Sequence, residues 1–477
     1  MAVHVRALCN AAVAATTIHR HYISRSVPFL FIEMWCDDAY QCFQTVPSLS
    51  IFALIISTLI KRANHHNRKQ SSMLPTLLLK RPSNLLYISE GNAHAVFQFK
   101  DGNVLRVPKK YRSHTEAVIA QRFTLHVWSK LLGQQYVIVP RPCILPSNSI
   151  NVINDVLSSS KRSPGRTNIV GNQGENGSCE LNSTTAEIVQ SALSLPIVSS
   201  TTTTTSPTAT VIPDRPCWSI EIKPKSGCLP SSKNIPEKSP KLVYSRYYMH
   251  QYLKLKQKKI SNVSQYSPID FFSNNERKVK NALNNMWLAP QNNMQLFLNG
   301  VKQDITKSTP KKDLLLNIAT NIILNENQLI NSVLKIQLMD VLDFEKESWN
   351  DYMNASSSCK VQETSTLSIY KTYVNGRTMT NIQKFLLART MMDCSFVLSF
   401  SPLCKNGNEV LSESSLQTVN ECGILKIVSD KSTEEYKWYQ YRIVVVDVDV
   451  KSISKLNQWM KLDQNIVQHF LQCSKHT

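Results

Sequence analysis

Carboxylates stand where predicted strands begin and end, and their placement suggests a specific chemistry. Asp447 and Asp449 follow the apolar run 443–446, and Asp393 comes shortly before a second largely apolar run, 396–400. In phosphoryl transfer one carboxylate orients and deprotonates the attacking hydroxyl, and another holds Mg²⁺ on the phosphates of ATP. Asp393 and Asp447 have the residue types for these two tasks, although either aspartate alone would be a common polar strand end.

Two lysines flank a proline in the segment 218–230, WSIEIKPKSGCLP. In extended backbone, residues two apart point to the same side, so Lys223 and Lys225 are expected side by side. Pro224 fixes the backbone and lowers the entropic cost of holding them there. Two such ammonium groups repel each other unless a polyanion lies between them. A phosphorylated ligand would meet that need, and a solvated basic edge is the open alternative.

A glycine precedes the first predicted strand, at Gly91 in the segment 90–93. A glycine at this position lets backbone amides approach phosphate oxygens closely. Arg106 lies on the predicted return strand and could sit over those phosphates. A plain turn and an exposed strand arginine remain the alternatives.

Two further segments carry candidate ligand-binding side chains. Residues 245–254 form a predicted helix with Lys254 toward its end. Asn292 and Asn293 open an apolar strand within 290–300. Such an asparagine can bond a sugar hydroxyl or complete a metal shell, whereas an Asx turn is the structural alternative.

The elements that must position these residues are a mixture of strands and helices. Residues 95–99 and 104–107 predict a hairpin, joined by the Asp-Gly turn of 100–103. Residues 113–133 and 326–343 have the apolar spacing of amphipathic helices. We therefore expect a hairpin-rich small lobe and a larger lobe, in an α+β or α/β arrangement that fits a bilobal nucleotide-binding enzyme.

Composition divides the chain into four zones. Residues 1–80 form an atypical extension, 81–157 a folded N-terminal lobe, and 215–477 a C-terminal lobe with the catalytic site. Residues 158–214 read as a low-complexity linker that contains the connection between the lobes. Few large apolar residues occur in this linker, so disorder is expected there.

The overall composition narrows the function. The chain has 477 residues, is 42% hydrophobic, and carries a net charge of +20. A core can be buried, and the charge predicts an acidic partner: nucleic acid, an anionic membrane surface or a polyanionic small molecule. Only 12 glycines exclude collagen-like repeats. The 12 cysteines include no C-x-x-C pair, which favours reduced thiols in a cytoplasmic or nuclear protein.

The N-terminal extension has features of a targeting segment. Residues 1–32 lack Asp and Glu but contain His and Arg, as transit peptides do. An apolar stretch, 46–60, precedes Lys61 and Arg62, and is short for a membrane span. A variable extension unrelated to function is the other interpretation.

Taken together, these segments resemble the inositol-pentakisphosphate 2-kinase family in content and order over roughly 81–470. The two most specific are EIKPK-x-G-x-LP and PQNN-x-x-x-FLNG. The matching segments are EGN at 90–92, VLR at 104–106, EIKPKSGCLP at 221–230, SRYYMHQYLK at 245–254, SPIDFFS at 267–273, PQNNMQLFLNG at 290–300, DCSFVLSF at 393–400 and DVDVK at 447–451.

The resemblance implies a protein of two lobes, distantly similar to protein kinases, that uses ATP and Mg²⁺. It implies phosphorylation of the 2-hydroxyl of inositol 1,3,4,5,6-pentakisphosphate to the hexakisphosphate, phytate. Asp393 would be the base and Asp447 a magnesium ligand together with Asn293. The ATP side would include Gly91, Asn92, Arg106 and Asn293, and the substrate phosphates would meet Arg166, Lys223, Lys225, Lys254, Asn292, Lys451 and Lys455. A charge of +20 suits a ligand with five phosphates, because each contact is charge-assisted.

Some positions depart from the family pattern. Lys455 stands where the family usually has Arg, which keeps the charge but loses the bidentate fork, and Trp459 replaces a common Tyr. The adenine-contacting connection is best placed at 186–195. No His occurs between His250 and His469, so the Cys₂His₂ zinc site of plant members is excluded there.

Two other functions stay open at this stage. An inactive inositol-polyphosphate-binding scaffold on the same fold is the first, and retention of Asp393 and Asp447 speaks against it. A nucleic-acid-binding protein is the second, but no aromatic-basic interleaving or known module supports it. We expect a monomer without an obligatory membrane or specific nucleic acid.

Overall fold

The computed structural model describes residues 85–90, 94–99, 103–160, 169, 184–192, 216–306, 311–345, 349–350, 364–402, 422–430 and 435–473. The chain divides into two compact units, Met1–Leu74 and Pro75–Thr477. All described residues belong to the second unit. The predicted N-terminal extension and the turn at 100–102 lie outside the described residues.

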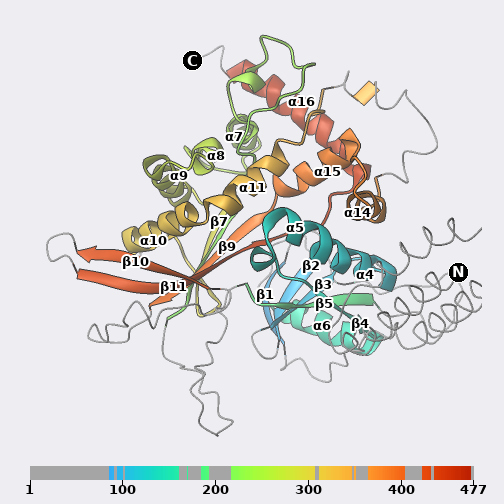
Figure 1. Cartoon of the computed structure of the whole chain (residues 1–477), viewed down its shortest axis with the longest axis vertical. Coiled ribbons are helices and arrows are strands. Elements are labelled where there is room, and N and C mark those ends of the chain that lie inside the picture. The colour runs from blue at the N-terminus through green and yellow to red at the C-terminus, as the bar shows by residue number, and fades with distance from the viewer. Residues whose placement is uncertain are drawn as a thin grey trace, which may run out of the picture. The chain divides into compact units, whose positions relative to one another are not determined.

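A five-stranded antiparallel sheet, called here the N-terminal sheet, is the first element of this unit (Figure 1). Its central hairpin confirms the sequence prediction, because Ala95 pairs with Val107 and Phe97 with Leu105. These residues are fully buried, as alternation along a one-sided sheet requires. In spatial order the strands are β1 (Leu86–Glu90), β2 (His94–Gln98), β3 (Asn103–Pro108), β5 (Thr184–Gln190) and β4 (Arg141–Leu145).

Strand β5 corrects the prediction that 158–214 lacks structure. It lies inside the sheet, paired with β3 on one side and β4 on the other. Thr184, Thr185, Ala186 and Glu187 are buried there. Composition averaged over the whole segment hid these seven residues, whose β-branched side chains favour a strand.

Helix α6 (Ser147–Ser159) supplies the hydrophobic cover of the N-terminal sheet. Its residues Ile153 and Leu157 are completely buried in one cluster with Phe97, Leu105 and Leu145. This cluster is separate from the larger core described next.

The predicted helix 113–133 is present but is built from three parts. Helix α4 (His114–Phe123) starts at Ser113, whose hydroxyl accepts from the amide of Glu116 in a capping box. It continues as a π-helical turn (Thr124–Trp128) and as α5 (Ser129–Leu132), ending at Gly133, whose φ is 108°. Phe123 and Trp128 pack into the larger core.

A six-stranded antiparallel sheet, called here the C-terminal sheet, lies at the centre of the larger core. The order is β10 (Gly423–Asp430), β11 (Glu435–Val446), β9 (Ser395–Pro402), β6 (Trp218–Ile222), β7 (Met294–Leu298) and β8 (Val301–Gln303). Every ladder in both described sheets is antiparallel, so the class is α+β rather than a parallel α/β sheet.

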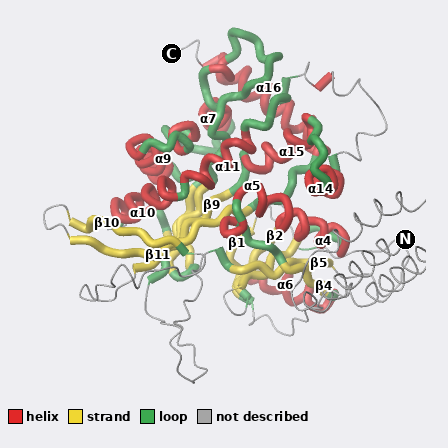
Figure 2. Tube along the Cα trace, viewed as in Figure 1, coloured by secondary structure: helices red, strands yellow, loops and turns green. Residues whose placement is uncertain are grey.

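Helices gather beside the C-terminal sheet, as Figures 1 and 2 show. The predicted helix at 326–343 is α11, which ends at Gln337. Among the described residues, no helix is long and apolar enough to cross a membrane. The helices are α7 (Arg246–Lys256), α8 (Pro268–Phe271), α9 (Glu276–Leu288), α10 (Lys312–Asn325), α11 (Asn327–Gln337), α14 (Thr366–Val374), α15 (Asn381–Met391) and α16 (Leu456–Cys473).

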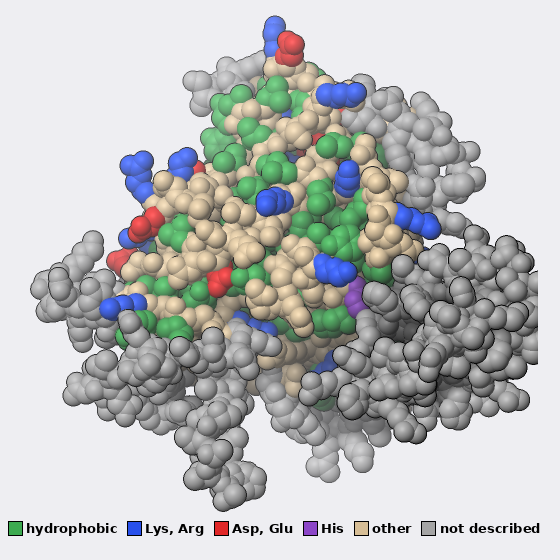
Figure 3. All heavy atoms as spheres, viewed as in Figure 1, with side chains coloured by type: hydrophobic (Ala, Val, Ile, Leu, Met, Phe, Trp, Pro, Cys, Tyr) green, Lys and Arg blue, Asp and Glu red, His purple; other side chains and the backbone are tan. Residues whose placement is uncertain are grey.

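Lysine and arginine side chains are scattered singly over the described surface in the view of Figure 3. Hydrophobic and polar side chains separate them. This face therefore shows no continuous basic patch in the described part of the chain.

Candidate active site

Strand register brings four of the predicted site segments to one edge of the C-terminal sheet. Val446, the last residue of β11, pairs with Ser395, the first of β9. Ile222, the last residue of β6, pairs with Phe396 of β9 and with Met294, the first of β7. Because neighbouring strands run in opposite directions, the end of one strand meets the start of the next. Asp447, Asp393, Lys223 and Asn293 therefore flank the same edge.

Asp393 is held between two lysines. Lys225 Nζ lies 3.2 Å from Oδ1 of Asp393, and Lys451 Nζ lies 2.7 Å from Oδ2. Burial alone would raise the pKa of Asp393, but these two ammonium groups lower it to about 2. The carboxylate is ionised at neutral pH, and its side chain is 53% exposed, so it is accessible to a ligand.

Asp447 occupies a backbone conformation that few side chains adopt. Its φ is 61°, in the left-handed region that aspartate tolerates better than most residues. Its Oδ2 accepts from Lys223 Nζ at 2.9 Å. A non-glycine residue in this region is strained, and the surrounding structure has to offset that strain. Such residues are found most often at functional sites.

A second carboxylate lies beside Asp447. Glu221 Oε1 accepts from the Ser395 hydroxyl at 3.0 Å and lies 3.6 Å from Lys223 Nζ. The Ser395 hydroxyl is also 3.4 Å from Asp447 Oδ2. Burial alone would lower the pKa of Lys223, but Asp447 and Glu221 raise it, which keeps this lysine charged.

Arg106 connects the two sheets. One guanidinium nitrogen lies 3.0 Å from Glu187 on β5, and the other binds Asp449, just after β11. Arg112 approaches the same glutamate at 2.5 Å. Burial would raise the pKa of Asp449, but Arg106 holds it well below its usual range. Arg106 thus lies near the edge that bears Asp447, with both nitrogens bound to carboxylates.

The helix that carries Lys254 presents a cluster of cations. Burial lowers the pKa of Lys254, and the positive charges of Lys225, Lys259 and Arg246 lower it further. The pKa of His250, one turn before Lys254, falls to about 3 through burial and the same cations together with Lys254. The charged neighbours with the largest effects on these two groups are all positive, so this cluster favours an anionic ligand.

The end of α7 explains why Lys259 joins this cluster. Lys258 has a φ of 54°, its amide donates to Leu255 O at 2.9 Å, and the Lys259 amide donates to Lys254 O at 2.9 Å. This pair of bonds is a Schellman motif, which reverses the chain after a helix. The reversal returns Lys259 to the level of Lys254.

The two predicted asparagines have different environments. Asn292 is exposed, whereas Asn293 is 1% exposed and donates from Nδ2 to the Tyr247 hydroxyl at 3.2 Å. Lys223 donates its amide to Asn293 O at 2.7 Å, which fixes the two strand ends together. The Asn293 side chain thus turns toward Tyr247, and its Oδ1 has no hydrogen-bond partner among the described residues.

The remaining predicted residues are less closely tied to this edge. Lys455 is exposed at the end of a 3₁₀ turn, Ile453–Lys455. Gly91, Asn92 and Arg166 lie outside the described residues. Of the expected adenine-contacting stretch, residues 186–190 belong to β5 and 193–195 are outside the described residues.

Sequence reasoning missed four side chains of the site: Glu221, Ser395, His250 and Lys259. Glu221 lies two residues before Lys223, so strand periodicity could have placed it beside that lysine. Lys225 does not continue the alternation expected from extended backbone, because its φ is 66°. His250 precedes Lys254 by four residues, and such positions share one helix face. Lys259 had no signal, because its position depends on the left-handed residue before it.

The carboxylates at this edge fit a hard divalent cation. Mg²⁺ usually takes one or two protein carboxylates, with phosphates and waters completing its shell. Asp447 supplies an exposed carboxylate, and Glu221 lies next to it. No group of three or more His, Cys, Asp or Glu suited to a metal occurs in the part of the chain that the structure describes.

The fold and this edge define a class: an α+β protein in which carboxylates and a surplus of lysines meet at one end of an antiparallel sheet. The family model for inositol-pentakisphosphate 2-kinase matches residues 87–465. The chain belongs to the inositol-pentakisphosphate 2-kinase family.

Curated relatives carry the same name. The inositol-pentakisphosphate 2-kinases of Oryza sativa subsp. indica and Arabidopsis thaliana are 28% and 27% identical over 286 residues, which cover 53% of this chain and 60% of each relative. The inositol-pentakisphosphate 2-kinase of Danio rerio is 41% identical over 86 residues, 18% of each chain. The matched part thus spans about three fifths of the length of the plant relatives.

Proposed function

We propose that this chain transfers the γ-phosphoryl group of ATP to the 2-hydroxyl of inositol 1,3,4,5,6-pentakisphosphate and forms inositol hexakisphosphate. The observation that carries the proposal is the position of Asp393, an exposed carboxylate between Lys225 and Lys451 at the edge that also bears Asp447. The names of the curated relatives support the choice of substrate.

The substrate phosphates would bind the surplus cations. Lys225, Lys254 and Lys451 are the lysines best placed for this task, with His250 and Lys259 beside them. A charge-assisted hydrogen bond to phosphate is stronger than a neutral one, so several of them position a small polyanion firmly. The exposed Asn292 and Lys455, together with Arg166, would complete this side.

Phosphate binding would also change Asp393. As Lys225 and Lys451 turn toward phosphates, Asp393 loses the charges that lower its pKa, and the pKa rises toward its ordinary value of 3.8. The carboxylate then accepts a hydrogen bond from the attacking hydroxyl and takes its proton. Positioning contributes most in phosphoryl transfer, so a weak base suffices.

Asp447 would hold Mg²⁺, with Glu221 adding negative charge beside it and Asn293 contributing an amide oxygen. The bound ion would neutralise phosphate charge and orient the γ-phosphoryl group. Lys223 would remain charged between Asp447 and the phosphates. Gly91, Asn92 and Arg106 would serve the ATP side, with Arg106 exchanging a carboxylate for phosphate.

We further propose that the two sheets form the two lobes of a kinase-like fold. The N-terminal sheet with α6 has a core of its own, and the C-terminal sheet lies in the larger core. Arg106 and the Trp128 indole, which donates to Val448 O at 2.9 Å, connect the first part of the chain to the catalytic edge.

The test is incubation of the full chain with ATP, Mg²⁺ and inositol 1,3,4,5,6-pentakisphosphate, with chromatographic separation of the products. We expect inositol hexakisphosphate, and no product from a pentakisphosphate that already carries the 2-phosphate. Tight binding of the substrate without turnover would instead support the inactive scaffold. Salt-dependent nucleic-acid binding with no inositol phosphate binding would support the third function.

A further inference from the structure

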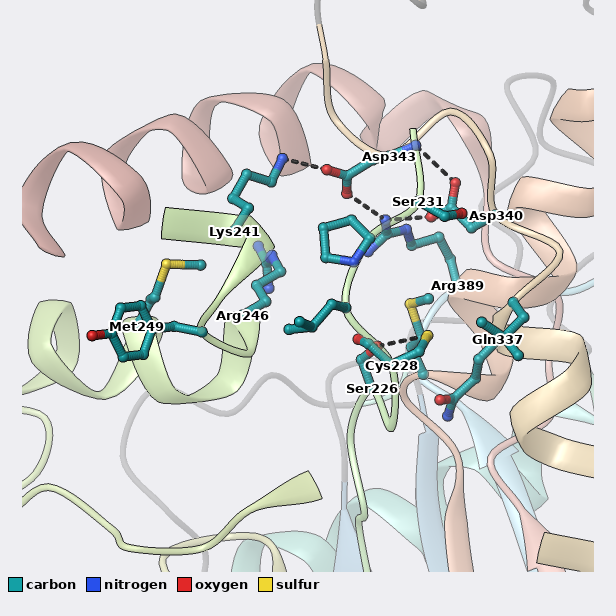
Figure 4. A pocket seen from close by; sticks show the side chains of 15 residues that line it. Ser226, Cys228, Ser231, Lys241, Arg246, Met249, Gln337, Asp340, Asp343 and Arg389 are labelled. Carbon is teal, nitrogen blue, oxygen red and sulfur yellow. Dashed lines mark hydrogen bonds and ion pairs between the residues drawn. The ribbon is translucent and has the colours of Figure 1, made fainter. Parts of the chain in front are cut away.

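Gln337, the last residue of α11, joins the loop that carries Lys225 to the end of α15, two residues before Asp393. Its side chain is completely buried and forms three hydrogen bonds. Oε1 accepts from the Gly227 amide at 2.8 Å, and Nε2 donates to Lys225 O and to Met391 O, each at 3.1 Å. Figure 4 shows Gln337 at the end of its helix beside the loop of Ser226 and Cys228.

The loop on one side of Gln337 contains Lys225 in a strained conformation. Lys225 has a φ of 66°, a left-handed conformation that lysine rarely adopts. Gln337 fixes the backbone that follows this residue through two bonds, one to the Lys225 carbonyl and one from the amide of Gly227. The Tyr266 hydroxyl donates to Pro224 O at 2.8 Å and fixes the loop on its other side.

The bond on the opposite side of Gln337 fixes the end of α15. Met391 O belongs to the last helical residue, two positions before Asp393. The Asp393 amide donates to Thr390 O at 3.1 Å, so the aspartate continues directly from this turn. Gln337 thus ties the backbone of Lys225 to the backbone that carries Asp393.

We propose that Gln337 is a positioning residue, which sets the distance between Lys225 and the base Asp393. This inference rests on the proposed function, because it assigns Gln337 a part in that reaction. A buried amide is a costly way to fill a core, since each polar atom needs a partner. Here all three partners are backbone groups, two in the loop of Lys225 and one at the end of α15, and an apolar side chain could not hold them.

The test uses two variants and a matched control in the full chain. Gln337→Met keeps the length of the side chain and removes all three bonds. Gln337→Glu keeps the acceptor for the Gly227 amide and removes the amide donor. Gln383→Met is the control, because Gln383 is also buried, lies on α15, and bonds Thr372 and Thr380.

We expect Gln337→Met to lower kcat by about 10–10²-fold with little change in the KM for ATP, because small misplacements at a reacting centre have effects of this size. The affinity for inositol hexakisphosphate, measured by titration calorimetry, should also fall. Gln383→Met should lower the melting temperature but leave kcat per folded molecule unchanged.

The glutamate variant provides a pH readout that lost stability alone would not move. Burial raises the pKa of the introduced carboxyl, and its protonated form regains an O–H donor. The kcat of Gln337→Glu relative to wild type should therefore rise as the pH falls. A wild-type kcat and affinity in Gln337→Met, or equal kcat losses in it and the control, would overturn the inference.

The calorimetric titration separates this inference from the proposed function. A wild-type chain that binds inositol hexakisphosphate but forms no product would overturn the proposed function. In that case a weaker affinity of Gln337→Met for the hexakisphosphate would still support the positioning role, and an unchanged affinity would contradict it. A wild-type chain that does not bind the hexakisphosphate would overturn both.

Discussion

Two ionic clusters in the larger part of the molecule differ in charge balance and in exposure. The first, called here the structural network, contains Lys241, Arg246 and Arg389 with Asp340, Asp343, Glu345 and Asp463. The second, called here the site cluster, contains Lys223, Lys225, Lys254, Lys259 and Lys451 with Glu221, Asp393 and Asp447.

In the structural network the charges satisfy one another. Asp463 lies 2.7 Å from Arg246 Nε and 3.0 Å from Lys241 Nζ, and Arg389 lies 2.5 Å from Asp340. The Arg389 guanidinium also packs 4.0 Å from the centre of the Phe344 ring. Figure 4 shows Lys241, Asp343, Arg389 and Asp340 of this network pointing toward one another beside a pocket.

In the site cluster cations outnumber carboxylates, and two of the three carboxylates, Asp393 and Asp447, are exposed. Asp393 is 53% exposed and Asp447 47%, against 4% for Asp340. The structural network has three cations for four mostly buried carboxylates, so its charges are met within the protein and breaking it should lower stability. The site cluster has five cations for three carboxylates, so a ligand would be needed to complete it. The difference indicates which charges to remove in order to change stability and which to change activity.

The largest effect should come from Asp393→Asn, which breaks the site cluster at its base. The amide keeps the size of the side chain but cannot take the proton. We expect kcat to fall by roughly 10²–10⁴-fold with little change in the KM for ATP. Steady-state kinetics measures this, and Asp313→Asn on the exposed start of α10 is the control. Near-normal kcat would remove Asp393 from the role of base.

Arg389→Met should break the structural network instead. It leaves Asp340 and Asp343 buried without their arginine, which should lower the free energy of unfolding by about 3–5 kcal/mol. Denaturant unfolding measures this loss. Arg377→Met, on the exposed surface, should change it by less than about 0.5 kcal/mol. Equal stability of the two variants would show that the network does not stabilise the fold.

Lys254→Ala should separate the two clusters most clearly. Because burial and neighbouring cations lower the pKa of Lys254, its charge is unfavourable in the folded state, and its removal should not lower stability. Loss of its phosphate contact should raise the KM for the inositol phosphate by an amount equivalent to about 1.5–3 kcal/mol. A larger effect on the KM for ATP than on the KM for the inositol phosphate would contradict the assignment of Lys254 to the substrate phosphates.

The smallest effect should be proton uptake at His250. Burial and four cations lower its pKa to about 3, well below the ordinary 6.5, so it is neutral near pH 6. Phosphates that neutralise those cations would raise this pKa, and the imidazole would take up a fraction of a proton. Calorimetry at pH 6, in buffers of different ionisation enthalpy, measures the uptake. The His250→Asn variant should take up fewer protons than wild type, and equal uptake would contradict the explanation.

Local pattern was sufficient to predict several elements. Alternation predicted the hairpin of Ala95 and Val107, and apolar spacing predicted α11. It was not sufficient for β5, because its seven residues lie in a segment that is otherwise polar.

The sequence predicted which residues belong to the candidate site but did not predict which side chains contact one another. Motif residues such as Asp393, Asp447 and Lys225 meet at one edge because strand register brings their segments there. Gln337 had no signal in the sequence, because its three partners become neighbours only when α11 packs against the loop of Lys225 and the end of α15. Lys259 also had no signal in the sequence. It lies beside Lys254 because Lys258 is left-handed, and that conformation depends on tertiary packing.

The most direct test of the central claim is a calorimetric titration of inositol 1,3,4,5,6-pentakisphosphate into the full chain. The wild type and Lys280→Ala, a control on the exposed face of α9, should bind one equivalent with the same affinity. Lys254→Ala should bind roughly 10–10²-fold more weakly, the equivalent of one lost charged contact. Equal affinity of Lys254→Ala and Lys280→Ala, or no binding to the wild type, would contradict the claim that the unbalanced cations form a polyphosphate site.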